Sequence, residues 1–292
     1  MVTSLQKILE YAEHENIGIG AFNIGNKDIF DSILKAAELT NSPVIVECAP
    51  EEIDFLGDDF FSYVRTQIEN SRIPICLHLD HGKNMEIVRR AIQLGFQSVM
   101  IDASDRNFEE NIKITREVCE YAHAYQVDVE GELGTIGTTG RASCGHTAEI
   151  KIQYTEPDSA KLFCELTGVN ALAIAIGTSH GLYPENEKPE LRIDILDAIH
   201  KCVKVPLVLH GGSGNKDEEL VKAVKHGIRK INVSSEVKEV YFNGIKSYLE
   251  THPGEVKTQI IQTEARLCTC KKIMERIQLF RVGGMENGEI YI

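Results

Sequence analysis

The chain has 292 residues, of which 42% are hydrophobic and 26% charged, proportions that are typical of a folded globular enzyme. Its formal net charge of −13 argues against a nucleic-acid partner, because binding to phosphate backbones needs a basic face. No apolar run approaches the roughly 20 residues that cross a bilayer, and the first residues do not read as a signal peptide. We therefore expect no membrane partner and a cytoplasmic location.

A helix is predicted over residues 3–14, and eight short apolar runs rich in Val and Ile follow it along the chain. Near-continuous apolar runs of this length are typical of parallel strands that are buried on both faces. The predicted strands cover residues 17–23, 43–49, 73–81, 98–104, 127–134, 171–177, 206–212 and 230–235.

Segments with helical periodicity lie between most of these strands. They cover residues 29–39, 85–94, 108–125, 159–166, 193–202 and 217–226. Strands that alternate with helices indicate βαβ units and a parallel sheet, which is the α/β class. Eight such units favour closure into a single (β/α)8 TIM barrel over an open sheet.

We predict a single barrel domain over residues 1–292. Some segments fall outside its repeating units. Residues 135–157 form a long loop, which at that length is usually functional or mobile, and we expect it to be mobile. A C-terminal helical extension is expected over residues 236–281, with helices near 236–250 and 257–281. The eight cysteines include no C-x-x-C pair, so we expect reduced, mostly structural thiols.

Polar residues gather where the predicted strands end, and in a barrel these ends meet on the face that carries active sites. Three histidines, His81, His180 and His210, follow three different strands. Three protein ligands with an open fourth position are typical of catalytic zinc, so these three are predicted to hold Zn²⁺. His78, three residues before His81, is interpreted as a core residue.

Three carboxylates belong to the same face. Asp80 adjoins His81 and is predicted to act as a general acid/base, although an Asp that caps the turn is the simpler alternative. Asp102 and Glu132 are interpreted either as carboxylates that orient the metal ligands or offer the metal a second position, or equally well as structural carboxylates.

A phosphate site is predicted from the glycine-rich run 211–214 and the polar end at 232–235. Glycines let a backbone approach an anion closely, and its N–H groups then act as donors. Barrels often bind phosphate in the loops after strands seven and eight, which are the loops in question.

At these residues the chain resembles the class II fructose/tagatose-bisphosphate aldolase family, over nearly its whole length. The most specific motifs are HLDHG at 78–82, MID at 100–102, EGELG at 130–134, AIGTSHG at 175–181 and LVLHGGS at 207–213. The resemblance implies a zinc-dependent lyase of carbohydrate metabolism, as in glycolysis. Such an enzyme reversibly splits fructose or tagatose 1,6-bisphosphate into dihydroxyacetone phosphate and glyceraldehyde 3-phosphate.

The resemblance also implies the residue roles. Zinc would be held by the three histidines named above and would act as a Lewis acid on the ketone, while Asp80 exchanges the proton of the aldehyde-derived hydroxyl. A monovalent cation (Na⁺ or K⁺) near the phosphate and a homodimer or homotetramer are further expectations. The residues expected near the phosphorylated sugar are Asn23, Gly181, Gly211, Gly212, Ser213, Asn232, Val233, Ser234 and Ser235.

The chain departs from the family pattern at three places. Residues 137–141 read GTTGR where relatives carry an acidic G-G-x-E-D stretch, so Glu149 or a water is a candidate for the missing proton donor. Ala49 stands where relatives often have a hydroxyl residue that faces the sugar. Ser235 replaces a threonine and keeps the hydroxyl.

Four alternatives stay open. A Schiff-base aldolase needs a lysine in the barrel mouth, whereas Lys230 is expected at the opposite rim. The others are a metal hydrolase or isomerase on the same barrel, a metal-binding barrel without turnover, and an aldolase for another phosphorylated ketose such as 5-dehydro-2-deoxyphosphogluconate.

Overall fold

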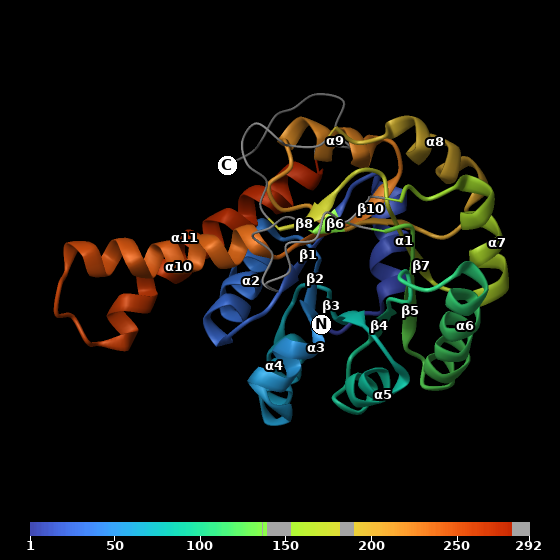
Figure 1. Ribbon diagram of the computed structural model, residues 1–292. Coiled ribbons are helices and arrows are strands. Elements are labelled where there is room, and N and C mark those ends of the chain that lie inside the picture. The colour runs from blue at the N-terminus through green and yellow to red at the C-terminus, as the bar shows by residue number, and fades with distance from the viewer. Residues whose placement is uncertain (136, 139–152, 182–189, 282–292) are drawn as a thin grey trace.

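The structure is a computed structural model that describes residues 1–135, 137–138, 153–181 and 190–281 (Figure 1). For residues 137–138 and 179–180 only the backbone is described. Eight parallel strands close into a barrel in the order β1-β10-β9-β7-β5-β4-β3-β2. Their bounds are β1 Ile19–Asn23, β2 Val44–Cys48, β3 Ile75–Gly82, β4 Ser98–Ile101, β5 Asp128–Leu133, β7 Ala171–Ile174, β9 Leu207–Leu209 and β10 Ile228–Val233.

The predicted TIM barrel is thereby confirmed, and each of the eight apolar runs overlaps one strand. Most strands are shorter than predicted. β4, β7 and β9 end three residues early, whereas β1 begins two residues late and β3 begins two residues late but ends one residue later than predicted. The last strand instead begins two residues earlier than predicted, at Ile228.

Helices surround the barrel, and those predicted between the strands are confirmed within a few residues at each end. They are α2 Lys27–Thr40, α5 Met85–Gln93, α6 Phe108–Ala124, α7 Pro157–Thr167, α8 Ile193–Cys202 and α9 Asp217–Lys225. Two helices between β2 and β3, α3 Pro50–Leu56 and α4 Asp58–Asn70, were not predicted. Gly57, with a φ of 78°, separates them and interrupts the apolar periodicity.

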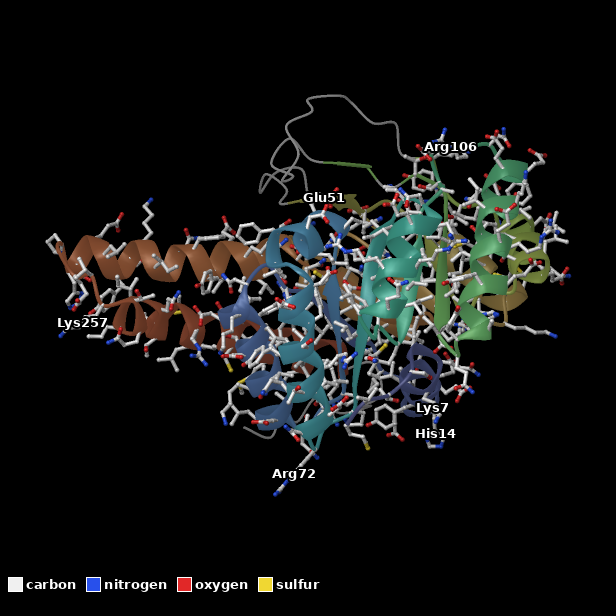
Figure 2. All side chains as sticks on the ribbon, turned by 90° about the horizontal axis from the view of Figure 1, so that it is seen from below. Lys7, His14, Glu51, Arg72, Arg106 and Lys257 are labelled. Carbon is white, nitrogen blue, oxygen red and sulfur yellow. The ribbon has the colours of Figure 1, made fainter. Side chains whose placement is uncertain are left out.

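The first helix, α1 Leu5–Glu15, closes one end of the barrel. Its apolar residues Leu5, Ile8 and Leu9 are buried in one cluster with inward-facing strand residues such as Ile45 and Met100. Because α1 fills this end, the opposite end, to which the carboxyl ends of the strands lead, carries the open mouth. Figure 2 shows Lys7 and His14 of the α1 region at one end of the barrel and Glu51 and Arg106 at the other.

Two long helices, α10 Ser235–Thr251 and α11 Thr258–Arg281, form the predicted C-terminal extension. They pack against each other as a hairpin that projects away from the barrel, while the last part of α11 returns beside β1 (Figure 1). At their crossing, a Cβ on Gly244 would lie 2.7 Å from the Cα of Ala265. Only glycine permits this approach.

Two short parallel strands, β6 Gly137–Thr138 and β8 Ser179–His180, form a separate sheet that was not predicted. The first lies within the predicted loop, and a bridge between Thr135 and Gln153 joins the two ends of that loop. Its centre, residues 139–152, lies outside the described residues. None of the described helices is long and apolar enough to span a membrane.

Candidate active site

Asp80 and His81 are neighbours in strand β3, yet both side chains reach the same place. Successive residues of a regular strand point to opposite faces. Here the pairing of β3 with β4 shifts between Leu79 and Gly82, and His81 has a left-handed backbone with a φ of 47°. Such an irregularity redirects a side chain, and histidine adopts this conformation more readily than most residues. Asp80 Oδ1 consequently lies 3.7 Å from His81 Nε2.

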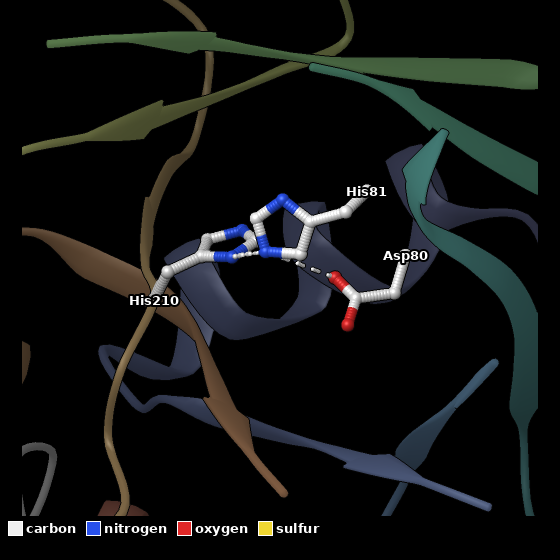
Figure 3. A group of neighbouring side chains, drawn as sticks. All are labelled: Asp80, His81 and His210. Atoms are coloured by element: carbon white, nitrogen blue, oxygen red, sulfur yellow. Dashed lines mark hydrogen bonds and ion pairs between the residues drawn. The ribbon is translucent and has the colours of Figure 1, made fainter. Parts of the chain in front are cut away.

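His81 and His210 meet at the barrel mouth, with His81 Nε2 3.1 Å from His210 Nδ1 (Figure 3). On their far sides, His81 Nδ1 lies 3.0 Å from Asp102 Oδ2, and His210 Nε2 lies 2.8 Å from Glu130 Oε1. An ionised carboxylate only accepts hydrogen bonds, so each ring donates its N–H there. The two nitrogens with lone pairs then face each other, an arrangement that calls for a proton or a metal ion between them.

The electrostatics of His81 favour a cation at this point. Burial opposes a charge on the ring. The Asp80 carboxylate, the hydrogen bond to Asp102 and the charge of Glu132 outweigh burial and raise the pKa of His81 to about 10. In the absence of a metal ion the ring is therefore protonated at neutral pH.

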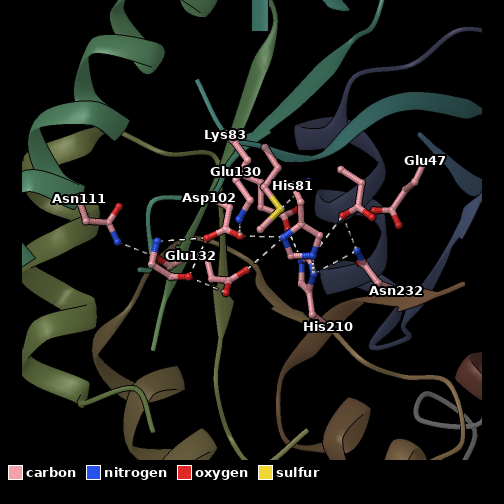
Figure 4. Close-up of polar contacts among 12 residues, drawn as sticks. Glu47, His81, Lys83, Asp102, Asn111, Glu130, Glu132, His210 and Asn232 are labelled. Atoms are coloured by element: carbon pink, nitrogen blue, oxygen red, sulfur yellow. Dashed lines mark hydrogen bonds and ion pairs between the residues drawn. The ribbon is translucent and has the colours of Figure 1, made fainter. Parts of the chain in front are cut away.

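Asp102 and Glu132 lie behind His81 (Figure 4). Asp102 also accepts hydrogen bonds from Lys83 Nζ at 2.5 Å and Ser104 Oγ at 2.7 Å. Although burial opposes its charge, His81 and Lys83 hold the pKa of Asp102 well below its usual range. Glu132 accepts from Ser104 at 3.1 Å, and burial together with the charge of Asp102 raises its pKa to about 8.

The Asp80 carboxylate accepts hydrogen bonds from two side-chain amides, one in β1 and one in β10, the two strands whose pairing closes the barrel. Asn23 Nδ2 donates to its Oδ2 at 2.9 Å, and Asn232 Nδ2 donates to its Oδ1 at 3.2 Å. Burial opposes ionisation, but the nearby charges of His81, His210 and Lys230 keep the pKa of Asp80 far below its usual value. The carboxylate is therefore ionised, oriented and able to accept a proton.

The loops after β9 and β10 adjoin this centre. Ser213 Oγ accepts hydrogen bonds from the backbone N–H groups of Ser234 and Glu236, at 3.2 and 3.4 Å. Helix α10 begins here at Ser235, and the side chain of its N-cap residue, Ser234, makes no hydrogen bond into the helix. The start of a helix offers N–H donors and a positive dipole to an anion.

Glycines bring the two loops together. Gly211 has a φ of 67°, and a Cβ on Gly212 would lie 2.7 Å from the carbonyl oxygen of Asn232. The N–H of Gly212 donates to that same oxygen at 3.0 Å. Val233 is wholly buried in the hydrophobic core, so only its backbone is available to a ligand. Gly181 follows β8 and is also buried.

His180 lies in β8, but its side chain is among those that the structure does not describe. Its predicted role as a third histidine ligand therefore stays a prediction. Glu149, the candidate proton donor, lies outside the described residues. The seven described cysteines are unpaired, as expected.

A cluster of charged residues inside the barrel was missed. Lys230, Glu47 and Glu130 are fully buried, and Lys230 Nζ lies 2.6 Å from Glu47 Oε1 and 2.9 Å from Glu130 Oε2. The expectation that Lys230 lies at the opposite rim is wrong, because β10 begins before it and the side chain points into the barrel core. Charged residues within strands buried on both faces were the available signal, since such residues are rarely buried unpaired. His78 is confirmed as a core residue, 2.7 Å from Ser98 Oγ through Nδ1.

The donor set fits a divalent metal ion. Asp80, His81 and His210 offer ligand atoms within 4.8 Å of one another, and so do His81, Asp102 and Glu132. Imidazole and carboxylate are ligands that zinc prefers, and outer carboxylates that fix the tautomer of ligating histidines are typical of zinc sites. The Oε2 atom of Glu132 is buried and has no hydrogen-bond partner among the described residues, which also suits a cation nearby.

Comparison with known proteins points the same way. Residues 3–285 match the model of the family described as fructose-bisphosphate aldolase class-II. The chain is 36% identical to a fructose-bisphosphate aldolase of Giardia intestinalis, with 96% of this chain and 93% of the relative covered. It is 35% identical to a sulfofructosephosphate aldolase of Alkalicoccus urumqiensis, with 96% of each chain covered.

Among solved structures, the YdjI aldolase from Escherichia coli K12 superposes with a TM-score of 0.84 at 31% identity, covering 96% of this chain and 97% of that one. A protein described as a putative fructose-1,6-biphosphate aldolase from Coccidioides immitis gives the same TM-score of 0.84 at 26% identity, covering 94% and 95%. These matches span nearly the full length of every chain compared. The chain belongs to the class II fructose-bisphosphate aldolase family and is a lyase that acts on a phosphorylated ketose.

Proposed function

We propose that this enzyme reversibly cleaves a ketose 1,6-bisphosphate, fructose or tagatose, into dihydroxyacetone phosphate and glyceraldehyde 3-phosphate. The observation that carries the proposal is the ionised, doubly hydrogen-bonded Asp80 beside the facing nitrogens of His81 and His210. A base and a cation position side by side are what cleavage next to a carbonyl group requires.

In the cleavage direction, Asp80 takes the proton of the C4 hydroxyl while the C3–C4 bond breaks. The two amides of Asn23 and Asn232 leave the carboxylate little freedom, so a lone pair stays directed at the substrate. A zinc ion held by His81, His210 and His180 would supply Lewis-acid stabilisation of the charge that develops on the substrate. Asp102 and Glu130 bond the other nitrogens of His81 and His210 and so fix which ring nitrogens would be available to the ion.

The phosphate of the dihydroxyacetone half is assigned to the loop at Gly211–Ser213 and to the start of α10. Backbone N–H groups are the donors there, which suits a chain whose net charge is −13 and which offers no general positive field. We also propose a monovalent cation near this phosphate, a homodimer or homotetramer, a single domain over residues 1–292 and a cytoplasmic role in carbohydrate metabolism such as glycolysis.

A second candidate substrate is sulfofructose phosphate. The relative named for that substrate is 35% identical to this chain, close to the 36% of the relative named for fructose bisphosphate. The two sugars would differ at the end remote from the proposed phosphate site.

Initial cleavage rates on all three sugar phosphates test the proposal, with zinc-loaded protein and with protein treated with chelator. We expect release of dihydroxyacetone phosphate that chelator abolishes and zinc restores. Asp80→Asn should lower kcat by about 10²- to 10⁴-fold, since it removes the general base, while zinc remains bound. Cleavage that persists in metal-free protein would contradict the mechanism, and no cleavage of any of the three by zinc-loaded protein would contradict the substrate assignment.

A further inference from the structure

The ammonium group of Lys230 is fully buried inside the barrel, where the proposed chemistry does not use it. Its Nζ contacts Glu47 of β2, Glu130 of β5 and the Oδ1 of Asn232, the last at 2.8 Å. Burying ions costs several kcal/mol each, and well-packed apolar residues often give equal or greater stability. Stability alone therefore does not account for a lysine here.

One contact of Lys230 orients Asn232. An ammonium has only donors, so the amide of Asn232 must turn its oxygen toward Lys230 and its Nδ2 group away. That Nδ2 group is the one that donates to Asp80 Oδ1 at 3.2 Å. With the amide reversed, an oxygen would face the carboxylate and repel it.

A second contact of Lys230 acts through Glu130. One oxygen of Glu130 faces the ammonium at 2.9 Å. The other accepts from His210 Nε2 at 2.8 Å, and Figure 4 shows Glu130 beside His210. The ammonium holds the Glu130 carboxyl group in place, and the oxygen that points the other way accepts the N–H of His210 Nε2. The lone pair of His210 is thereby kept on Nδ1, which faces His81.

We propose that Lys230 is a positioning residue whose buried ammonium sets both the Asn232 donor on Asp80 and, through Glu130, the tautomer of His210. The proposal rests on the proposed function for the roles of Asp80 and His210. The three contacts of the ammonium and its complete burial also argue against a Schiff-base role, which needs a neutral amine that substrate can reach.

The chain offers a matched control in Glu47. Glu47 shares the ammonium, but in the described contacts its side chain bonds neither Asn232 nor His210. Glu47→Gln therefore changes one partner of Lys230 and leaves both connections in place. Glu130→Gln replaces the carboxylate only in the connection to His210, where an amide can present either its oxygen or its NH₂ group, and Lys230 can still bond Asn232.

The experiment compares zinc affinity, by competition with a chromophoric chelator, and the separate values of kcat and KM. In Lys230→Met we expect zinc affinity to fall by about 10- to 100-fold, as for other outer-shell changes at zinc sites. We expect kcat to fall by at least about tenfold with little change in KM, since the phosphate loops are untouched. Glu130→Gln should lower zinc affinity similarly but reduce kcat less, and Glu47→Gln should have the smallest effect on both.

Removal of the lysine alone leaves Glu130 without its cation and can prevent folding. The double variant Lys230→Met with Glu130→Gln removes both charges and serves if the single variant does not fold. Wild-type zinc affinity and kcat in a folded Lys230 variant, or losses no larger than in Glu47→Gln, would overturn the proposal. If zinc affinity falls as expected but the wild-type protein cleaves none of the sugars, the proposed function fails while the assignment of Lys230 to the metal site stands.

Discussion

Each side chain that faces the site is oriented by hydrogen bonds to other side chains farther from it. His81 presents Nε2 to the site because Asp102 accepts from Nδ1, and Asp102 is itself held by Lys83 and Ser104. The sequence indicates that Asp80 and His81 belong together, since they are adjacent and follow an apolar strand. It does not show that both reach one side, because this depends on a local register shift and a left-handed residue. Nor does it show which carboxylate bonds which ring, since the partners come from other strands.

Asp102→Asn tests the outer support of His81. An amide can present either its oxygen or its NH₂ group to the ring, so the His81 tautomer is no longer held. We expect zinc affinity to fall by about 10- to 100-fold, measured by chelator competition. Asp105→Asn, at an exposed position on the same loop, is the control and should leave affinity unchanged. Equal affinities of the two variants would remove Asp102 from the metal site.

At the scale of helices and strands, the sequence predicts best where one pattern runs long enough. The eight strands and most outer helices have clear periodicity and are found where expected. Helices α3 and α4 escape because Gly57 divides them and because Phe55, which looks like a core residue, is 78% exposed. The two-residue strands β6 and β8 are too short to leave a pattern. They pair because the fold brings residues 137–138 beside residues 179–180, which are distant in the sequence.

The hairpin of α10 and α11 depends on the close approach at Gly244. Gly244→Ala should gain up to about 1 kcal/mol from helix propensity but lose about 1–3 kcal/mol to the clash with Ala265, so we expect net destabilisation. Urea unfolding measures the difference. Asn243→Ala, at the exposed neighbouring position, gains the propensity without the clash and should be neutral or stabilising. A Gly244→Ala variant as stable as Asn243→Ala would show that the helices can separate without cost.

At the scale of the whole molecule, the barrel interior is electrostatically unusual for a packed core. Two carboxylates, Glu47 and Glu130, share the single ammonium of Lys230. Burial, which Lys230 only partly offsets, raises the pKa of Glu47 to about 8. At neutral pH Glu47 therefore holds a proton, which lowers the negative charge around the ammonium of Lys230. No periodicity in the sequence could reveal this arrangement, since it arises only when three distant strands close.

The buried Glu47 makes the free energy of unfolding depend on pH. In the unfolded chain Glu47 ionises near 4.5, whereas in the folded protein it does so near 8. Between these values the folded state binds more protons, so the contribution of Glu47 to the free energy of unfolding decreases as pH rises, by up to about 1.4 kcal/mol per pH unit. Above pH 8 its contribution is constant.

Urea unfolding of the wild-type protein and of Glu47→Gln from pH 5 to pH 9 measures this contribution as the difference between the two curves. We expect the stability of the wild type, relative to the variant, to fall up to about pH 8 and then level off. A flat difference over this range would mean that Glu47 is ionised throughout.

The position of Asp80 also has a consequence for how the protein is made. Its two amide donors come from β1 and β10, the first and last strands of the barrel, which pair only when the ring closes. A ribosome releases residue 80 long before residue 232, so the growing chain carries the carboxylate without its second donor and without His210. The nascent polypeptide therefore has no assembled reactive centre, and activity appears only with the final strand.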